Sequence, residues 1–393
     1  MSKLNELIEK LCPNGVEFKK LEELLTYEQP TKYIVKTTKY SDEYTIPVLT
    51  AGQSFILGYT NEDKGIFNAS NKKPVIIFDD FTTSFHWVDF DFKVKSSAMK
   101  ILKPINDNVN FKYIYYAMST IKYIPGNHAR HWISVYSQFS VPVPPLEVQR
   151  EIVHILDDFT LLSAELSAEL EARKRQYCYY REKLFEFNND GELKTMGELF
   201  PFIRNGFVGT IRPFFTDEKN GIRYLEGTNI HNGIISDNEM IYVTKEFHQR
   251  HKKNELKEDD ILMVQSGHIG ECAVVGKKYK GANCHALIIM SNGGKCLSKY
   301  IVHYFHTLKG FKALNPAITG GTIKHVLAGK IGKIKVPCPP IEEQTKIVNI
   351  LDKLEKLCND ISEGLPAEIE ARQKQYEYYR AKLLKFKELK VNE

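Results

Sequence analysis

The sequence lacks the patterns that would mark a membrane, secreted or zinc-binding protein. None of its 393 residues lies in a run approaching the ~18 apolar residues that a membrane-spanning helix needs. The opening MSKLNELIEKL is an amphipathic, mixed-charge pattern without the apolar segment of a signal peptide. The seven cysteines form no CxxC pair and leave one over, which favours reduced thiols. We therefore expect a cytoplasmic protein without a disulfide framework or a metal site.

The motifs of self-contained catalysis are missing as well. The sequence has no GxxxxGK[ST] phosphate loop, no HExxH and no GxSxG. Asp79 and Asp80 follow an apolar run, but no third carboxylate is suitably placed, so a strand-end role is favoured over a metal site. His285, inside another apolar run, fits a satisfied core or rim histidine. We expect no catalytic residue and no cofactor in this chain.

What the sequence does contain is one long stretch that occurs twice. Residues 144–187 begin PPLEVQREIVHILD and residues 339–386 begin PPIEEQTKIVNILD, and both copies continue to QYxYYRxKL. The offset is 195 residues at the start (144 to 339) and 199 at the end (180 to 379), so the second copy is about one helical turn longer. A proline pair can open a helix at no hydrogen-bond cost, so each copy should begin a helix.

Apolar side chains in both copies recur at steps of three and four, which predicts a coiled-coil seam. The nearest partner for one seam is the other copy, so we predict that the two helices pack antiparallel. Gly364-Leu365-Pro366 lies inside the second pattern and predicts a kink or break there. The residues expected at the helix-helix and partner interface are Leu156, Phe159, Leu166, Leu170, Tyr177, Tyr180, Leu351, Leu354, Tyr376 and Tyr379.

The segments between the repeats have a different pattern, with short β-type runs punctuated by Gly, Asn and Asp. Each ends with a helical pattern (111–122 and 297–308), a polar loop and a last strand, so the two segments should share a fold while their surfaces differ. The fold class is α+β. The expected boundaries are an N-terminal helix (1–15), a first strand-rich domain (16–143), a first long helix (144–188), a second domain (189–338) and a C-terminal helix (339–393).

Loops rich in Arg, Lys, Gln, Asn, Ser, Thr and His follow these strands. Such side chains hydrogen-bond to base edges, while Lys and Arg hold phosphates, and the formal net charge of +5 suits an anionic partner. The candidate DNA-binding residues of the first domain are Gln53, Thr82, Thr83, Ser84, Lys95, Ser96, Ser97, His128, Arg130 and His131. Those of the second domain are Arg204, Arg212, Thr228, Asn229, Gln265, Ser266, His268, Thr322, Lys324 and His325.

Two variable domains, each followed by a copy of PP[LI]ExQxxIVxILD and QYxYYRxKL, resemble the specificity subunit of type I restriction-modification enzymes. The resemblance covers essentially the whole chain. The tandem Ser-Ala-Glu-Leu at 163–170 is similar to the tetrapeptide repeat in the central conserved region of one subgroup of that family.

The resemblance implies two target-recognition domains, each reading one half of a split site in double-stranded DNA. The paired helices would hold them apart with pseudo-two-fold symmetry and set the spacer. It also implies two methyltransferase subunits that bind S-adenosylmethionine and act on adenine N6, and restriction subunits that use ATP and Mg²⁺. This chain alone would not be an enzyme.

Two other interpretations stay open at this stage. One is a non-catalytic coiled-coil scaffold without base readout. The other is a single chain that fuses recognition to methyl transfer, which the absence of an Asn/Asp-Pro-Pro-aromatic motif disfavours; the nearest match is the Asn-Pro-Ala-Ile at 315–318.

Overall fold

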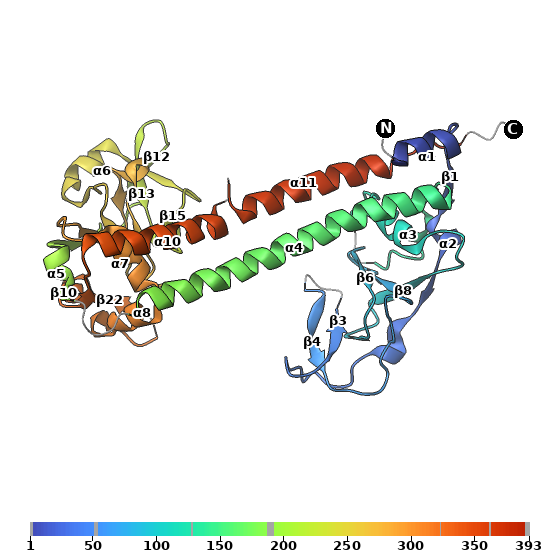
Figure 1. Ribbon diagram of the computed structural model, residues 1–393, viewed down its shortest axis with the longest axis horizontal. Coiled ribbons are helices and arrows are strands. Elements are labelled where there is room, and N and C mark those ends of the chain that lie inside the picture. Colours follow the sequence, from blue (N-terminus) through green and yellow to red (C-terminus); the bar gives the residue numbers. More distant parts are fainter. Residues whose placement is uncertain are drawn as a thin grey trace. The chain divides into compact units, whose positions relative to one another are not determined.

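The computed structural model describes residues 3–50, 54–126, 129–186, 192–322, 324–360 and 363–389. The chain divides into two compact units (Figure 1). Unit 1 comprises Met1–Leu166 and Ile369–Glu393, and unit 2 comprises Ser167–Glu368. Gln53 and His128 lie outside the described residues, as does Phe187, the last residue of the first repeat.

Unit 1 contains a four-stranded antiparallel sheet in the order β2-β8-β5-β6, a three-stranded sheet in the order β4-β3-β7, and the antiparallel pair β1-β9. Successive side chains of β5 point to opposite faces of the sheet, so Ile76 and Phe78 belong to one core and Val75 and Ile77 to another. The elements are α1 (Lys3–Leu11), β1 (Glu17–Lys20), α2 (Leu21–Leu24), β2 (Leu25–Glu28), β3 (Ile46–Leu49), β4 (Ile56–Thr60), β5 (Val75–Asp79), β6 (Phe85–Val88), β7 (Lys93–Val94), β8 (Met99–Pro104), α3 (Phe111–Met118) and β9 (Ser140–Val143).

Unit 2 repeats this plan with insertions. Its sheets run β11-β20-β17-β18 and β12-β16-β13-β19, with the pair β10-β23 beside them. The elements are β10 (Leu193–Thr195), α5 (Met196–Leu199), β11 (Phe202–Asn205), β12 (Phe215–Thr216), β13 (Gly221–Leu225), β14 (Ile230–His231), β15 (Ile234–Ile235), β16 (Ile241–Thr244), α6 (Lys245–Arg250), β17 (Ile261–Val264), β18 (Cys272–Val274), β19 (Asn283–Cys284), β20 (Leu287–Ser291), α7 (Ser298–Phe305), α8 (Leu308–Ala313), β21 (Ile318–Thr319), β22 (His325–Val326), α9 (Ala328–Ile331) and β23 (Lys335–Pro337).

The two units share one internal topology. Strands β2, β8, β5 and β6 occupy the positions of β11, β20, β17 and β18. In each second sheet one pair is parallel, β3 with β7 and β13 with β19. This confirms the prediction that both domains have the same α+β fold, although their loop sequences differ.

The first repeat forms a single helix, α4 (Leu146–Leu184), which begins directly after the proline pair (Figure 1). The second forms α10 (Ile341–Asn359) and α11 (Leu365–Leu383). The predicted break is confirmed, and Pro366 stands in the first turn of α11, where its missing N–H costs no hydrogen bond. A side chain at Gly364 would come within 2.6 Å of the Asp360 carbonyl oxygen, so only glycine fits there.

The repeated helices pack antiparallel within each unit. In unit 1, Leu156 of α4 is fully buried in the core that also holds Leu384, and the Phe159 ring stacks on Tyr379 at 5.5 Å. In unit 2, Leu351 of α10 is fully buried, and Leu170 and Leu354 pack against the same core. Tyr376 joins the unit 1 core, and Leu166 is half-buried.

Tyr177 and Tyr180 differ, although both fit the predicted seam. Tyr177 is buried and its hydroxyl lies 3.4 Å from the Glu355 carboxylate of α10. Tyr180 is 41% exposed and stacks edge-to-face on Tyr179 instead. One turn separates the two rings, and Tyr177 takes the inward position. Tyr180 therefore does not pack between the helices. Its contact with a partner subunit stays a prediction.

The glutamine of the repeated Pro-Pro-x-Glu-x-Gln motif has the same contacts in both units. The buried Gln149 side chain donates to the Pro144 carbonyl (2.6 Å) and accepts from the Asn110 N–H (2.8 Å) at the start of α3. Gln344, also buried, donates to the Pro339 carbonyl (2.7 Å) and accepts from the Leu297 N–H (2.9 Å) at the start of α7. Each glutamine therefore fixes a long helix to the short helix of its own domain.

Candidate nucleic-acid interface

In unit 1, three loops meet beyond the end of β5. Asp79 orders the first of them, because its carboxylate accepts from the Phe81 N–H at 2.9 Å and from the Thr82 hydroxyl at 2.5 Å. The resulting tight turn places Thr83 in the left-handed region, at φ 59°. Asx turns of this kind are a usual role for aspartate after a strand.

Asp80 connects that turn to the other two loops. Its N–H donates to the Ala98 carbonyl at 3.0 Å, and its carbonyl accepts from the His131 N–H at 2.8 Å. Its carboxylate accepts from the Trp132 N–H at 2.9 Å and lies 3.4 Å from the Lys100 ammonium group, with both side chains buried. The two aspartates therefore have the predicted strand-end roles.

The unit 1 candidates differ in how much surface they present. Thr82, Ser84 and Arg130 are exposed, and Lys95, Ser96 and Ser97 are half-buried. Thr83 and His131 are buried, at 8% and 4% exposure, and the His131 ring is hydrogen-bonded to the Tyr123 hydroxyl at 3.0 Å. These two residues hold the loops together, so the polar surface comes from the other six.

Unit 2 brings the corresponding loops together beyond the end of β17. The Val326 N–H donates to the Gln265 carbonyl at 2.9 Å, and Ser266 forms a β-bridge with His325. The turn at 227–229 joins them, because Gly227 lies against the Val264 side chain. Nearby, the His268 ring centroid is 6.1 Å from that of His231.

Among the unit 2 candidates, five side chains are exposed and two are half-buried. The exposed ones are Thr228, Ser266, His268, Thr322 and Lys324, and the half-buried ones are Gln265 and His325. Asn229 is only 2% exposed, and its amide donates to the Ser236 and Asn238 carbonyls at 3.2 and 3.0 Å, so it closes its own turn.

Arg204 and Arg212 do not belong to this cluster. Arg212 is exposed at the start of a short 3-10 turn before β12. Arg204 lies on β11, where its guanidinium donates to the Ser291 hydroxyl at 2.8 Å. His285, predicted to be a core or rim residue, is half-buried with its ring 3.4 Å from the Tyr224 hydroxyl.

The joint between each domain and its helix contains a repeated polar contact to an aspartate of the long helix. In unit 2, the buried His303 of α7 lies 2.9 Å from the Asp352 carboxylate, and Lys299 pairs with Glu355 at 2.6 Å. Burial lowers the pKa of His303, which favours the neutral ring. In unit 1, Asp157 takes the place of Asp352 in the repeat and accepts from the Tyr116 hydroxyl.

Of the described residues, His303, Asp352 and Glu355 are the one set whose ligand atoms lie close enough together for a metal ion, within 4.8 Å of one another. The Lys299 ammonium group already pairs with the Glu355 carboxylate, so these contacts are those of an ion-pair network and not of a metal site. Over the same described residues, no helix has the length and apolarity needed to cross a membrane.

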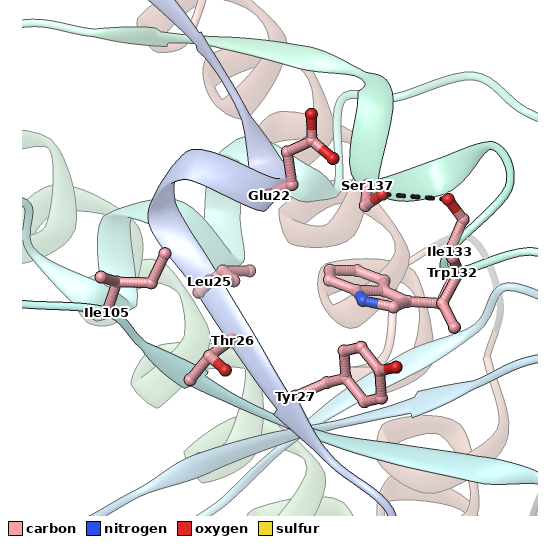
Figure 2. A pocket seen from close by; sticks show the side chains of 8 residues that line it. All are labelled: Glu22, Leu25, Thr26, Tyr27, Ile105, Trp132, Ile133 and Ser137. Carbon is pink, nitrogen blue, oxygen red and sulfur yellow. Dashed lines mark hydrogen bonds between the residues drawn. The ribbon is translucent and has the colours of Figure 1, made fainter.

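A hollow of about 610 Å³ lies beside the unit 1 cluster (Figure 2). The Trp132 and Tyr27 rings lie next to each other in its lining, and Ile105 and Ile133 expose apolar surface at its rim. Its charged side chain is that of Glu22, and no lysine or arginine is among the described residues that line it. The hollow is therefore unsuited to a phosphate group.

Comparison with known proteins identifies the family. The profile described as "Type I restriction modification DNA specificity domain" matches residues 13–172 and 188–371. The chain belongs to the type I restriction-modification DNA specificity family. Over 410 aligned residues it is 43% identical to the specificity subunit of the type I restriction enzymes EcoR124I and EcoR124II from Escherichia coli, which covers 98% of each chain.

Solved structures of type I systems have the same fold. The S subunit from M. genitalium aligns with a TM-score of 0.57 at 14% identity, covering 94% of this chain and 96% of that one. A chain from a structure concerned with complex assembly and conformational transition of the type I system gives a TM-score of 0.58 at 16% identity, covering 95% and 98%. Within the type I family, the two strand-rich domains are thus the specificity domains.

Sequence reasoning missed one group of cations in this type I chain. The run Arg250-His251-Lys252-Lys253 begins at the last residue of α6 in unit 2, and Lys257 comes four residues later. The signal was visible as four consecutive basic or imidazole side chains, but these lie outside the loops that follow the predicted strands.

Proposed function

We propose that each unit of this chain reads one half of a bipartite DNA site, unit 1 through the loops around Asp80 and unit 2 through the loops around Gln265. One observation carries this proposal. In both units the loop after the third strand of the sheet is hydrogen-bonded to the loop before the last strand, through His131 to Asp80 and Val326 to Gln265. The backbone arrangement repeats while the exposed polar side chains differ, as expected of one scaffold presenting two readout surfaces.

The chemistry belongs to partner subunits in this proposal. Two methyltransferase subunits carrying S-adenosylmethionine dock on the helices and methylate adenine N6 after the base leaves the duplex. Restriction subunits that use ATP and Mg²⁺ join them. Exposed tyrosines at matching positions support a docking point on each repeat, since Tyr179 and Tyr378 are 59% and 62% exposed and each stacks edge-to-face on the tyrosine that follows it.

Duplex binding tests the proposal against a scaffold without base readout. With its methyltransferase subunits, the chain should bind a duplex that carries its site with a steep negative dependence on salt, because phosphate contacts release counterions. Unlabelled site-bearing duplex should compete at least ~10³-fold better than random duplex. Equal competition by both duplexes would favour the scaffold.

A further inference from the structure

Unit 2 has a cationic hollow along β11, the edge strand of the sheet β11-β20-β17-β18. It consists of two adjoining depressions of about 320 and 430 Å³ that share Arg204 and Lys253. Lys252, Lys257 and Glu255 line the first, and His251 lines the second. We call the surface formed by Arg204, Lys252, Lys253 and Lys257 the basic hollow.

The charges of the basic hollow are only partly compensated. Arg204 is fixed by the Ser291 hydroxyl and the Glu255 carbonyl, and its guanidinium is 3.9 Å from the buried Asp260. Its Nε–H is buried and has no hydrogen-bond partner. Within the described ranges, no carboxylate lies within 4.0 Å of the ammonium groups of the three lysines, all of which are exposed.

At the equivalent edge of unit 1, a carboxylate stands where unit 2 has the Arg204 guanidinium. Strand β2 holds the edge position there, and Glu28 lies level with Ile77 of β5, as Arg204 lies level with Leu262 of β17. Ile77 lies two residues before the end of β5, and Leu262 lies two residues before the end of β17. Glu28 therefore occupies the position in unit 1 that Arg204 occupies in unit 2.

Glu28 pairs with the two lysines beside it. Lys103 and Lys32 lie 2.6 and 2.7 Å from its carboxylate, and although partial burial opposes the charge, their hydrogen bonds lower the pKa of Glu28 to about 2. The hollow beside this edge is the apolar one that contains Glu22 (Figure 2). Unit 1 therefore offers paired cations at the edge where unit 2 offers unpaired ones.

The basic hollow runs along the β11 edge, from Phe202, which pairs with Ser291, to Asn205 at the end of the sheet where the unit 2 reading loops lie. Asn205, which ends β11, pairs with Ile288, and Val264, which ends β17, pairs with Leu287, the next residue of β20. Two strand spacings separate β11 from β17, about 10 Å. A duplex seated on the reading loops would therefore bring backbone phosphates within reach of the lysine side chains.

We propose that the basic hollow binds backbone phosphates beside the half-site read by unit 2, and that unit 1 makes no matching contact at its own edge. This inference rests on the proposed function. It makes DNA binding asymmetric, because an added sequence-independent contact anchors one half of the complex. Phosphate contacts of this kind fix position on the duplex without carrying base information.

The test is a salt titration of duplex binding with the full chain and its methyltransferase subunits. Each lost phosphate contact should make the slope of log K against log salt shallower by about 0.9, so the pair Lys252→Gln and Lys253→Gln should change it by about 1.8. Adding Lys257→Gln should give about 0.9 more. Affinities for site-bearing and random duplex should fall by the same factor.

The matched control is the pair Lys309→Gln and Lys312→Gln on α8, which removes the same charge from exposed positions of the same unit. It should leave the slope unchanged. An unchanged slope in the Lys252 and Lys253 variant, or an equal change in the control, would overturn the phosphate site.

Neutral methylphosphonates locate the contact. Placed beside the unit 2 half-site, they should weaken wild-type binding and have no further effect on the Lys252 and Lys253 variant. At the corresponding phosphates beside the other half-site, they should leave the binding of both proteins unchanged. If site-bearing duplex were not preferred at all while the slope still changed, the proposed function would fail and the phosphate site would stand.

Discussion

A chain carrying both Leu156→Asp and Leu351→Asp should lose cooperative folding and aggregate. Both leucines are fully buried where a repeated helix packs on its unit, Leu156 in unit 1 and Leu351 in unit 2. Deleting such a side chain costs about 2–5 kcal/mol, and burying an unpaired carboxylate adds several more. The sum over two sites reaches the whole stability of an ordinary domain, about 5–15 kcal/mol.

Thermal unfolding followed by circular dichroism measures this effect. The matched control is Leu161→Asp with Ile350→Asp, on the same helices but 59% and 44% exposed, and it should unfold cooperatively near the wild-type temperature. A soluble Leu156 and Leu351 double variant with a cooperative transition would show that the two helices do not organise the units.

Inserting a third Ser-Ala-Glu-Leu after Leu170 should lengthen the spacer between the two half-sites by one base pair. The tandem at 163–170 lies inside the unbroken α4, so four added residues extend the helix by about 6 Å and turn its far end by about 40°. One base pair rises about 3.4 Å and rotates roughly 35°. The rotation therefore matches a single base pair.

The mismatch between the helix translation and the rise of one base pair is easier to accommodate than a mismatch in rotation. Helix tilt or a modest DNA distortion costing a few kcal/mol can absorb about 3 Å. Two base pairs would fit the translation but miss the rotation by about 30°, which would displace a groove-bound domain sideways. The second repeat is already divided between Asn359 and Leu365, so the partner of α4 is not one rigid rod.

Methylation mapping of the insertion variant with its methyltransferase subunits is the measurement. Both half-site sequences should be retained. A scrambled octapeptide that keeps the length of α4 and the leucines at 166 and 170, such as Ala-Ser-Glu-Leu twice at 163–170, should leave the spacer unchanged. An unchanged spacer in the insertion variant, or altered half-site bases, would refute the helix as a ruler.

Local patterns in the sequence predicted the scaffold of this type I chain well. The proline pairs mark where α4 and α10 begin, and Gly364 and Pro366 mark the break, because both residues act through the backbone of their own segment. The exposure of the candidate DNA-binding residues was harder to predict. Whether His131 or Asn229 is exposed depends on loops distant in sequence, so their burial was not visible from composition.

The structural roles of the repeated glutamines also could not be predicted without the fold. Gln149 and Gln344 stand in the motif that best identifies the family, yet their hydrogen bonds reach Asn110 and Leu297, 39 and 47 residues away. The basic hollow likewise joins β11 to a turn after α6. Its charge reversal against Glu28 emerged only from the strand register.

The central claim, that one chain reads two half-sites with two independent domains, is tested most directly by exchanging residues 16–143 for those of a relative. Methylation is then mapped across the genome of a host expressing the exchanged chain with its methyltransferase subunits. One half of the methylated site should change to that of the relative, while the other half and the spacer stay as in the wild type. A change in both halves would contradict the account.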